Sequence, residues 1–173
     1  MKDNVDGGDN SAFGEGALAS NTSSIRNTAL GRASLASITS NSNRHVAVGY
    51  AALVSLTGGN ENVAVGNEAG QAMTTGDSNT IVGSYAGDAL TTGGQNTAIG
   101  RAALSTATTA SYNVAVGYKA LDQCTSSENV AVGNNCLKSL TTGANNVAVG
   151  YNCADAMTTG DYNTAMGVNA LTS

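Results

Sequence analysis

A five-residue motif, Asn-Val-Ala-Val-Gly, recurs through the chain and constrains the fold more than any other feature. It stands unchanged at residues 62–66, 113–117, 129–133 and 146–150. Six looser copies bring the total to ten, mostly 17 residues apart, with one step of 18 and one of 16. A period this regular is typical of a solenoid, in which each repeat forms one rung of a coil.

The composition agrees with a thin, repeating core. The 173 residues include 22 glycines but only one Phe, no Trp and no Pro, so large side chains are not available to fill a globular centre. The net charge is −5, and the seven Lys and Arg residues are scattered singly, so we do not expect nucleic-acid binding. No apolar run is long enough to insert into a membrane.

The motif itself indicates a short strand followed by a corner. With the Asn as position 0, positions 1 to 3 are β-branched or otherwise apolar in nearly all copies, which suits a strand buried on both faces. Position 4 is always Gly, which indicates a positive φ or a close backbone approach. These predicted corner glycines are Gly14, Gly31, Gly49, Gly66, Gly83, Gly100, Gly117, Gly133, Gly150 and Gly167.

Position 2 is Ala in nine copies and Ile81 in the tenth. Alternate strand residues face opposite sides, and we expect the bulkier positions 1 and 3, such as Val147 and Val149, to fill the coil. Position 2 would then point outward, either into a tight packing face of the same chain or into a subunit interface; we favour the interface. The candidate interface residues are Ala12, Ala29, Ala47, Ala64, Ala98, Ala115, Ala131, Ala148 and Ala165.

The second half of each repeat carries small or apolar residues at positions 7, 8 and 11 and a Thr at position 12. Their spacing fits one helical turn or a bent strand. Stacked strands lie ~4.8 Å apart, whereas packed helices need ~8–10 Å, so we predict a bent strand or a tight turn. The predicted fold is an all-β solenoid (a parallel β-roll or β-helix) with ~17-residue rungs, forming a rod of about 45–50 Å. The alternative is a strand plus a short helical turn in each rung.

Stacking also predicts a ladder of amide side chains at position 0. Its members are Asn10, Asn27, Asn62, Asn79, Asn96, Asn113, Asn129, Asn146 and Asn163. His45 occupies the remaining slot, so we expect it to be structural. We assign residues 1–9 to a polar lead-in and residues 10–173 to the solenoid, whose last repeat is incomplete. Because no cap is visible, we expect a segment of a longer protein or an end-to-end assembly.

The motif, with the Leu-Thr-Thr-Gly that follows it in several repeats, resembles repeats of bacteriophage tail-fibre proteins. It is also similar to the head repeats of YadA-like trimeric autotransporter adhesins, which contain Asn-Ser-Val-Ala-Ile-Gly. The resemblance covers about residues 10–173, although the adhesin repeats are shorter, near fourteen residues. It implies a homotrimeric fibre or adhesin segment, located in a virion or at a cell surface.

The residues offer no constellation for catalysis. A single His excludes His pairs and triads, and the carboxylates lie on distant rungs, so we predict no enzyme activity, cofactor or metal site. Cys136 and Cys153 would be neighbours at position 7, and we expect free thiols. Three tyrosines on the variable turn, Tyr50, Tyr118 and Tyr151, are candidate contacts for a cell-surface glycan or receptor, although we favour the interpretation that they cover neighbouring rungs.

The predicted function is therefore a stiff, repetitive spacer that displays turn residues for surface or host attachment. The alternative is a monomeric binding solenoid, for which the Thr column suggests ice and the tyrosines suggest a glycan.

Overall fold

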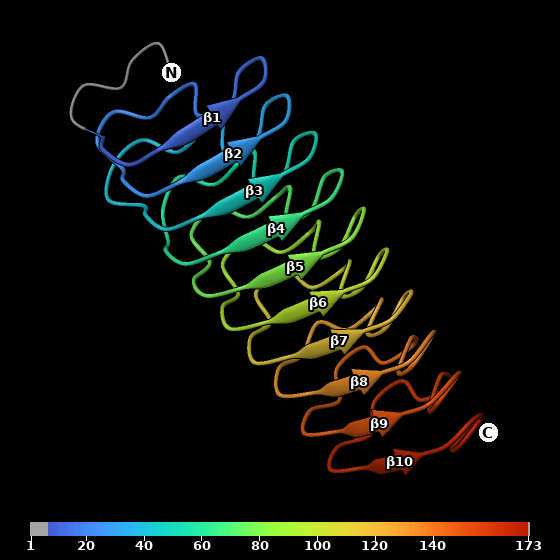
Figure 1. The fold of residues 1–173 in the computed structure, drawn as a ribbon. Coiled ribbons are helices and arrows are strands. Elements are labelled where there is room, and N and C mark those ends of the chain that lie inside the picture. Colours follow the sequence, from blue (N-terminus) through green and yellow to red (C-terminus); the bar gives the residue numbers. More distant parts are fainter. Residues whose placement is uncertain (1–6, 173) are drawn as a thin grey trace.

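The computed structural model describes residues 7–172, and this part of the chain is an all-β coil without a helix. Ten three-residue strands stack in chain order into one parallel sheet, with β1 at one end and β10 at the other (Figure 1). The predicted β-solenoid with ~17-residue rungs is confirmed. The strands are β1 (Ser11–Phe13), β2 (Thr28–Leu30), β3 (Val46–Val48), β4 (Val63–Val65), β5 (Thr80–Val82), β6 (Thr97–Ile99), β7 (Val114–Val116), β8 (Val130–Val132), β9 (Val147–Val149) and β10 (Thr164–Met166).

The register of the sheet is the register of the repeat. Each strand pairs with the next at the same motif positions, as where Ala47 lies opposite Ala64. The 18-residue and 16-residue steps keep this register, since β2 pairs with β3 and β7 with β8 in the same way. Nine steps of ~4.8 Å place β1 and β10 roughly 43 Å apart. Equivalent residues consequently form columns along the rod.

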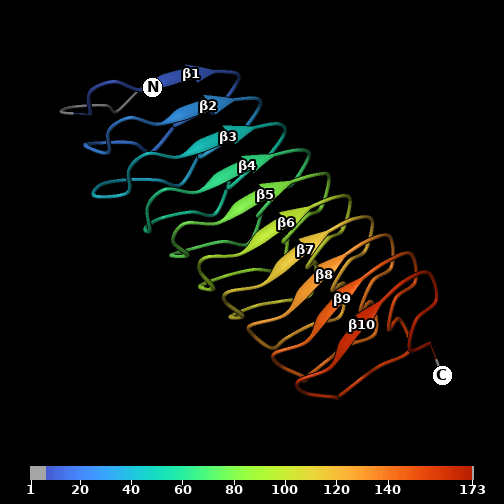
Figure 2. The ribbon, with the colours of Figure 1, turned by 60° about the horizontal axis from the view of Figure 1, so that its bottom comes forward.

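The strands form one wall of the coil, and the turns of successive rungs stack along the other walls (Figure 2). In the turn after each corner Gly, the φ angle is positive at every second residue. Ala51 at position 6 and Leu53 at position 8, for example, have φ values of 52° and 50°. The Leu53 N–H then donates to the carbonyl of Ala69 in the next rung, at 3.0 Å. The tight turn is confirmed, and the helical alternative is wrong because this turn bonds between rungs.

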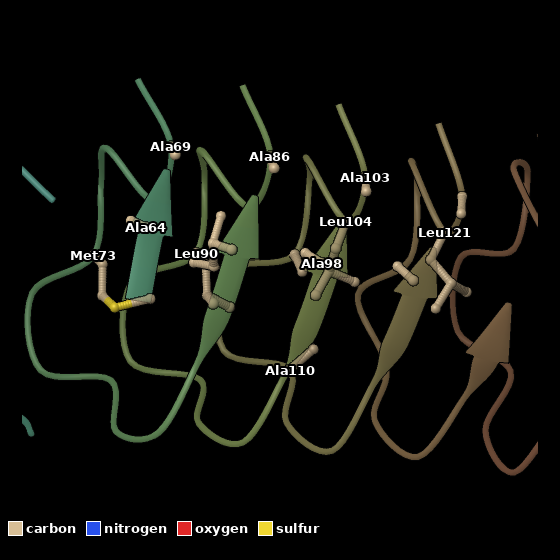
Figure 3. Close-up of a cluster of buried hydrophobic side chains, with 14 of the residues drawn as sticks. Ala64, Ala69, Met73, Ala86, Leu90, Ala98, Ala103, Leu104, Ala110 and Leu121 are labelled. Carbon is tan, nitrogen blue, oxygen red and sulfur yellow. The ribbon is translucent and has the colours of Figure 1, made fainter. Parts of the chain in front are cut away.

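The core is a line of small and medium side chains along the axis. Alanines of position 2 and residues of positions 7, 8 and 11 follow one another inside the coil (Figure 3). Leu35, Leu53 and Leu104 of position 8 are fully buried although their φ values are positive. Left-handed Leu costs roughly 1–2 kcal/mol per residue, so burial of these side chains outweighs a recurrent backbone strain.

The described coil already includes the end of the predicted lead-in. Gly8 accepts a hydrogen bond from the backbone N–H of Arg26 at 3.1 Å, and Asp9 lies 3.9 Å from the Arg26 side chain. Residues 1–6 of the lead-in lie outside the described residues.

Candidate interaction surface

The alanine column lies inside the coil. Ala148 is only 1% exposed, whereas Val147 beside it is 39% exposed. The prediction that position 2 points outward and positions 1 and 3 fill the coil is therefore wrong, and the alanines do not form an outward subunit surface. Ala29, Ala47, Ala64, Ala98, Ala115, Ala131, Ala148 and Ala165 are buried, and Ala12 is partly buried against the same core.

The alanines are small because the opposite wall supplies the bulk. Position 8 is Leu in most rungs, and these leucines share one core cluster with the alanines. Ile81 replaces the alanine in one rung. Position 8 is Gly87 in that rung and Gly70 in the rung before it. A Cβ added to either Gly would lie 3.2 Å from Ile81 Cδ1. In this part of the coil the large residue is at position 2 and the small residue is at position 8, the reverse of the arrangement in most rungs.

Positions 1 and 3 of the ten strands form what we call the outer face of the sheet. Fifteen of its 20 residues are apolar, five are Ser or Thr, and none is charged. Phe13 is 77% exposed, and Ile99 in the middle of the rod is 38% exposed. The sequence carried a signal for this face: position 3 ranges in size from Val to Phe, and a tightly packed core position would not tolerate that range.

The two rims of the outer face carry the charges that the face lacks. On the rim before the strands, Arg44 Nη1 lies 2.8 Å from Glu61 Oε1. On the rim after the strands, at position 5, Arg32 pairs with Glu15 at 3.1 Å and lies 5.8 Å from the ring centroid of Tyr50. These pairs link adjacent rungs and are largely exposed, so each adds less than about 1 kcal/mol to stability.

The three candidate tyrosines occupy this second rim. Tyr50, Tyr118 and Tyr151 are all exposed. Arg101 and Lys119 each lie 5.8 Å from the ring centroid of Tyr118. The rung spacing separates Tyr118 from Tyr151 by ~10 Å and from Tyr50 by ~19 Å. The structure therefore places them in one column without bringing them into a single site.

The asparagine column forms a continuous ladder. Asn96 Oδ1 accepts the backbone N–H of Asn113 at 3.0 Å, while its Nδ2 donates to Asn79 Oδ1 at 3.0 Å and to the carbonyl of Ala110 at 2.9 Å. The first two bonds join successive rungs, and the third closes the turn of the same rung. Backbone-to-amide bonds of the first kind join Asn10, Asn27, Asn62, Asn79, Asn96, Asn113, Asn129, Asn146 and Asn163, with His45 inserted between Asn27 and Asn62.

His45 continues the ladder as a neutral ring. Its backbone N–H donates to Asn27 Oδ1, and its Nδ1 accepts the backbone N–H of Asn62 at 3.2 Å. The proton therefore resides on Nε2, which lies 2.9 Å from Ser42 Oγ. Burial lowers the pKa of His45 to about 4. A ring that accepts a backbone N–H and stays neutral is structural.

Two independent constraints require Gly at nine of the ten corners, and the first of them also applies to Gly167. All ten have φ between 123° and 144°. A Cβ on Gly83 would lie 2.5 Å from the carbonyl oxygen of Gly100 in the next rung. The corners thus stack more closely than any other residue type allows.

The threonine column is a second ladder. Thr57 Oγ1 donates to the carbonyl of Thr74 at 3.3 Å, and Thr91 Oγ1 donates to that of Thr108 at 2.8 Å. Thr22, Thr74, Thr125 and Thr141 make the same bond. Six of the nine hydroxyls of this column therefore donate within the chain.

The remaining reactive groups are dispersed or buried. Cys124, Cys136 and Cys153 are free and buried, and burial together with the neighbouring Cys153 raises the pKa of the Cys136 thiol to about 12. Burial also raises the pKa of Asp88, whose Oδ1 has no hydrogen-bond partner. Within residues 7–172, no group of His, Cys, Asp and Glu is arranged to hold a metal ion, and no helix could span a membrane.

No protein-family model matches the sequence, and searches of curated proteins and of solved structures found no match either. The candidate interaction surface is accordingly defined by this chain's own geometry: an uncharged outer face between two polar rims.

Proposed function

We propose that the chain is a non-enzymatic structural segment, a stiff spacer within a homotrimeric fibre or adhesin of a virion or cell surface. The resemblance of its repeats to those of tail fibres and YadA-like heads motivates this assignment. The observation that carries it is the asparagine ladder, in which a backbone N–H of each rung donates to the position-0 side chain of the rung before it, from Asn10 to Asn163.

Stiffness follows from how those bonds are distributed. Strand hydrogen bonds hold one wall, the asparagine ladder holds the start of each strand, and the Thr57-to-Thr74 type of bond holds the far turn. Bending the rod in any direction would stretch at least one of these columns. Side-chain and backbone bonds in such columns contribute about 1 kcal/mol each, and their number makes a bend costly.

The turns are the part that the spacer would display. Tyr118 and Tyr151 present an exposed ring with a polar tip on a rim that varies from rung to rung. Rings of this kind suit contact with a glycan or a protein receptor. In this proposal, the core and ladders set the length of the spacer, while the rim residues make the attachment.

Stiffness can be tested by spin labels at Ser40→Cys and Thr159→Cys, two exposed turn positions seven rungs apart. The native thiols are buried, so labelling should be confined to the new sites. In labelled chains diluted with an excess of unlabelled chain, pulsed electron resonance should give one narrow distance near ~34 Å, seven rung spacings. A broad distribution would rule out a stiff spacer.

A further inference from the structure

We infer that the outer face of the sheet is the surface through which copies of this chain associate, with three copies closing around a common axis. This inference rests on the proposed fibre function and adds the surface and the geometry of assembly.

The chemistry of the outer face is that of an interface centre. All 30 strand residues are uncharged, and position 3 is apolar in all ten strands, from Phe13 to Met166. The charges lie on the rims, as with Arg32 and Glu15 on one side and Arg44 and Glu61 on the other. An apolar centre within a polar rim is the usual anatomy of a protein interface.

The repeat indicates what covers this face. Because the sheet is in register, the face presents one pattern at every ~4.8 Å along roughly 43 Å. A partner that complements the whole length must repeat its own surface at the same interval. A second copy of this coil does so without further requirement, whereas an unrelated globular protein would match only a few rungs.

The width of the wall fits a triangle. A wall of five residues, from the Asn at position 0 to the Gly at position 4, spans ~16.5 Å. Sheets pack about 10 Å apart, so each wall should stand ~5 Å from the shared axis. Three walls at that distance enclose a triangle with sides of ~17 Å, close to the length of one wall.

The test compares two substitutions in the same rung. Val132→Lys places a charge on the outer face, and Thr142→Lys places the same charge on an exposed turn of that rung. By light scattering, the unaltered chain and Thr142→Lys should have about three times the 17.1 kDa mass of one chain. Val132→Lys should be a monomer with unchanged circular dichroism. A trimer of Val132→Lys, or a monomeric or dimeric unaltered chain, would overturn the inference.

A milder variant guards against misfolding. Thr occupies position 1 in several strands, so Val114→Thr with Val130→Thr should fold normally. These changes remove apolar surface from each chain, and the trimer should dissociate at a concentration at least about tenfold higher. An unchanged dissociation midpoint would contradict the inference. The narrow spin-label distance reports on the spacer function separately, because it measures one labelled chain whatever the mass of the assembly.

Discussion

Ile81 fills the space that a side chain on Gly87 would occupy: a Cβ on that Gly would stand 3.2 Å from Ile81 Cδ1 and 3.7 Å from two further carbons of the same side chain. A Cβ on Gly70, in the preceding rung, would also stand 3.2 Å from Ile81 Cδ1. In seven of the other nine rungs a Leu at position 8 accompanies an Ala at position 2; the other two have Gly70 and Ala154 there. Ile81 thus occupies core space that a position-8 side chain occupies in most other rungs.

This exchange predicts non-additive stability. Gly87→Leu alone should overpack the core and destabilise it by about 1–3 kcal/mol. Ile81→Ala alone should leave a cavity and cost about 2–5 kcal/mol. The double variant restores the pattern of seven other rungs, and its loss of stability in urea unfolding should be clearly less than the sum of the two single losses. Additive losses would show that the two residues do not share one space.

The corner column predicts a graded response to Gly→Ala. At Gly83 the new Cβ meets both a positive φ and the next rung's carbonyl, so we expect a loss of about 3 kcal/mol or more. At Gly167 only the positive φ opposes the change, and the loss should be about 1–2 kcal/mol. Gly8, which meets nothing within 4 Å and has no positive φ, is the control and should be neutral. Equal effects at all three would contradict close stacking.

The asparagine ladder predicts a large loss of stability when one of its side chains is truncated to Ala. Asn96→Ala leaves the Asn113 N–H and the Ala110 carbonyl without their partner inside the coil. Each such buried group costs about 1–3 kcal/mol, so the variant should lose about 2–4 kcal/mol in denaturant unfolding. Asn134→Ala, an exposed turn position, is the matched control and should change stability by less than about 0.5 kcal/mol. If Asn96→Ala left the free energy of unfolding unchanged, the asparagine ladder would not contribute to stability.

His45 predicts a specific response to acid. In the folded chain it stays neutral until its pKa of about 4, whereas in the unfolded chain it takes up a proton near 6.5. Because the unfolded state binds more protons between these values, stability falls as the pH drops from about 6.5 to 4, by roughly 3 kcal/mol. His45→Asn restores the residue found in the other nine repeats, and this variant should not show the loss of stability between about pH 6.5 and 4. Equal pH slopes for the two proteins would contradict the neutral, buried ring.

The period, the strand positions, the corner glycines and the asparagine ladder were all readable from the sequence, because each rests on identical residues in one column. The direction of the strand faces was not. Alternation shows that Ala148 and Val149 face opposite sides, but it does not say which side is inside. That depends on Leu137 and the other position-8 residues, which cross the coil from the far wall to cover the alanines.

The shape of the turn was also beyond the sequence. Leu53 and Leu104 adopt positive φ values that Leu avoids in isolation, and only burial in the finished coil stabilises them. The Ile81 and Gly87 exchange, by contrast, was present in the columns and could have identified the inward side.

The alanine column fills the coil, while the residues on either side of each alanine form the outer face. Paired substitutions in β7, Ala115→Phe and Val116→Phe, test it directly by circular dichroism and urea unfolding. Ala115→Phe should abolish the folded coil, because that side chain is fully buried, and Val116→Phe should keep the coil folded, as Phe13 does at the same position in β1. A folded Ala115→Phe beside an unfolded Val116→Phe would contradict the claim.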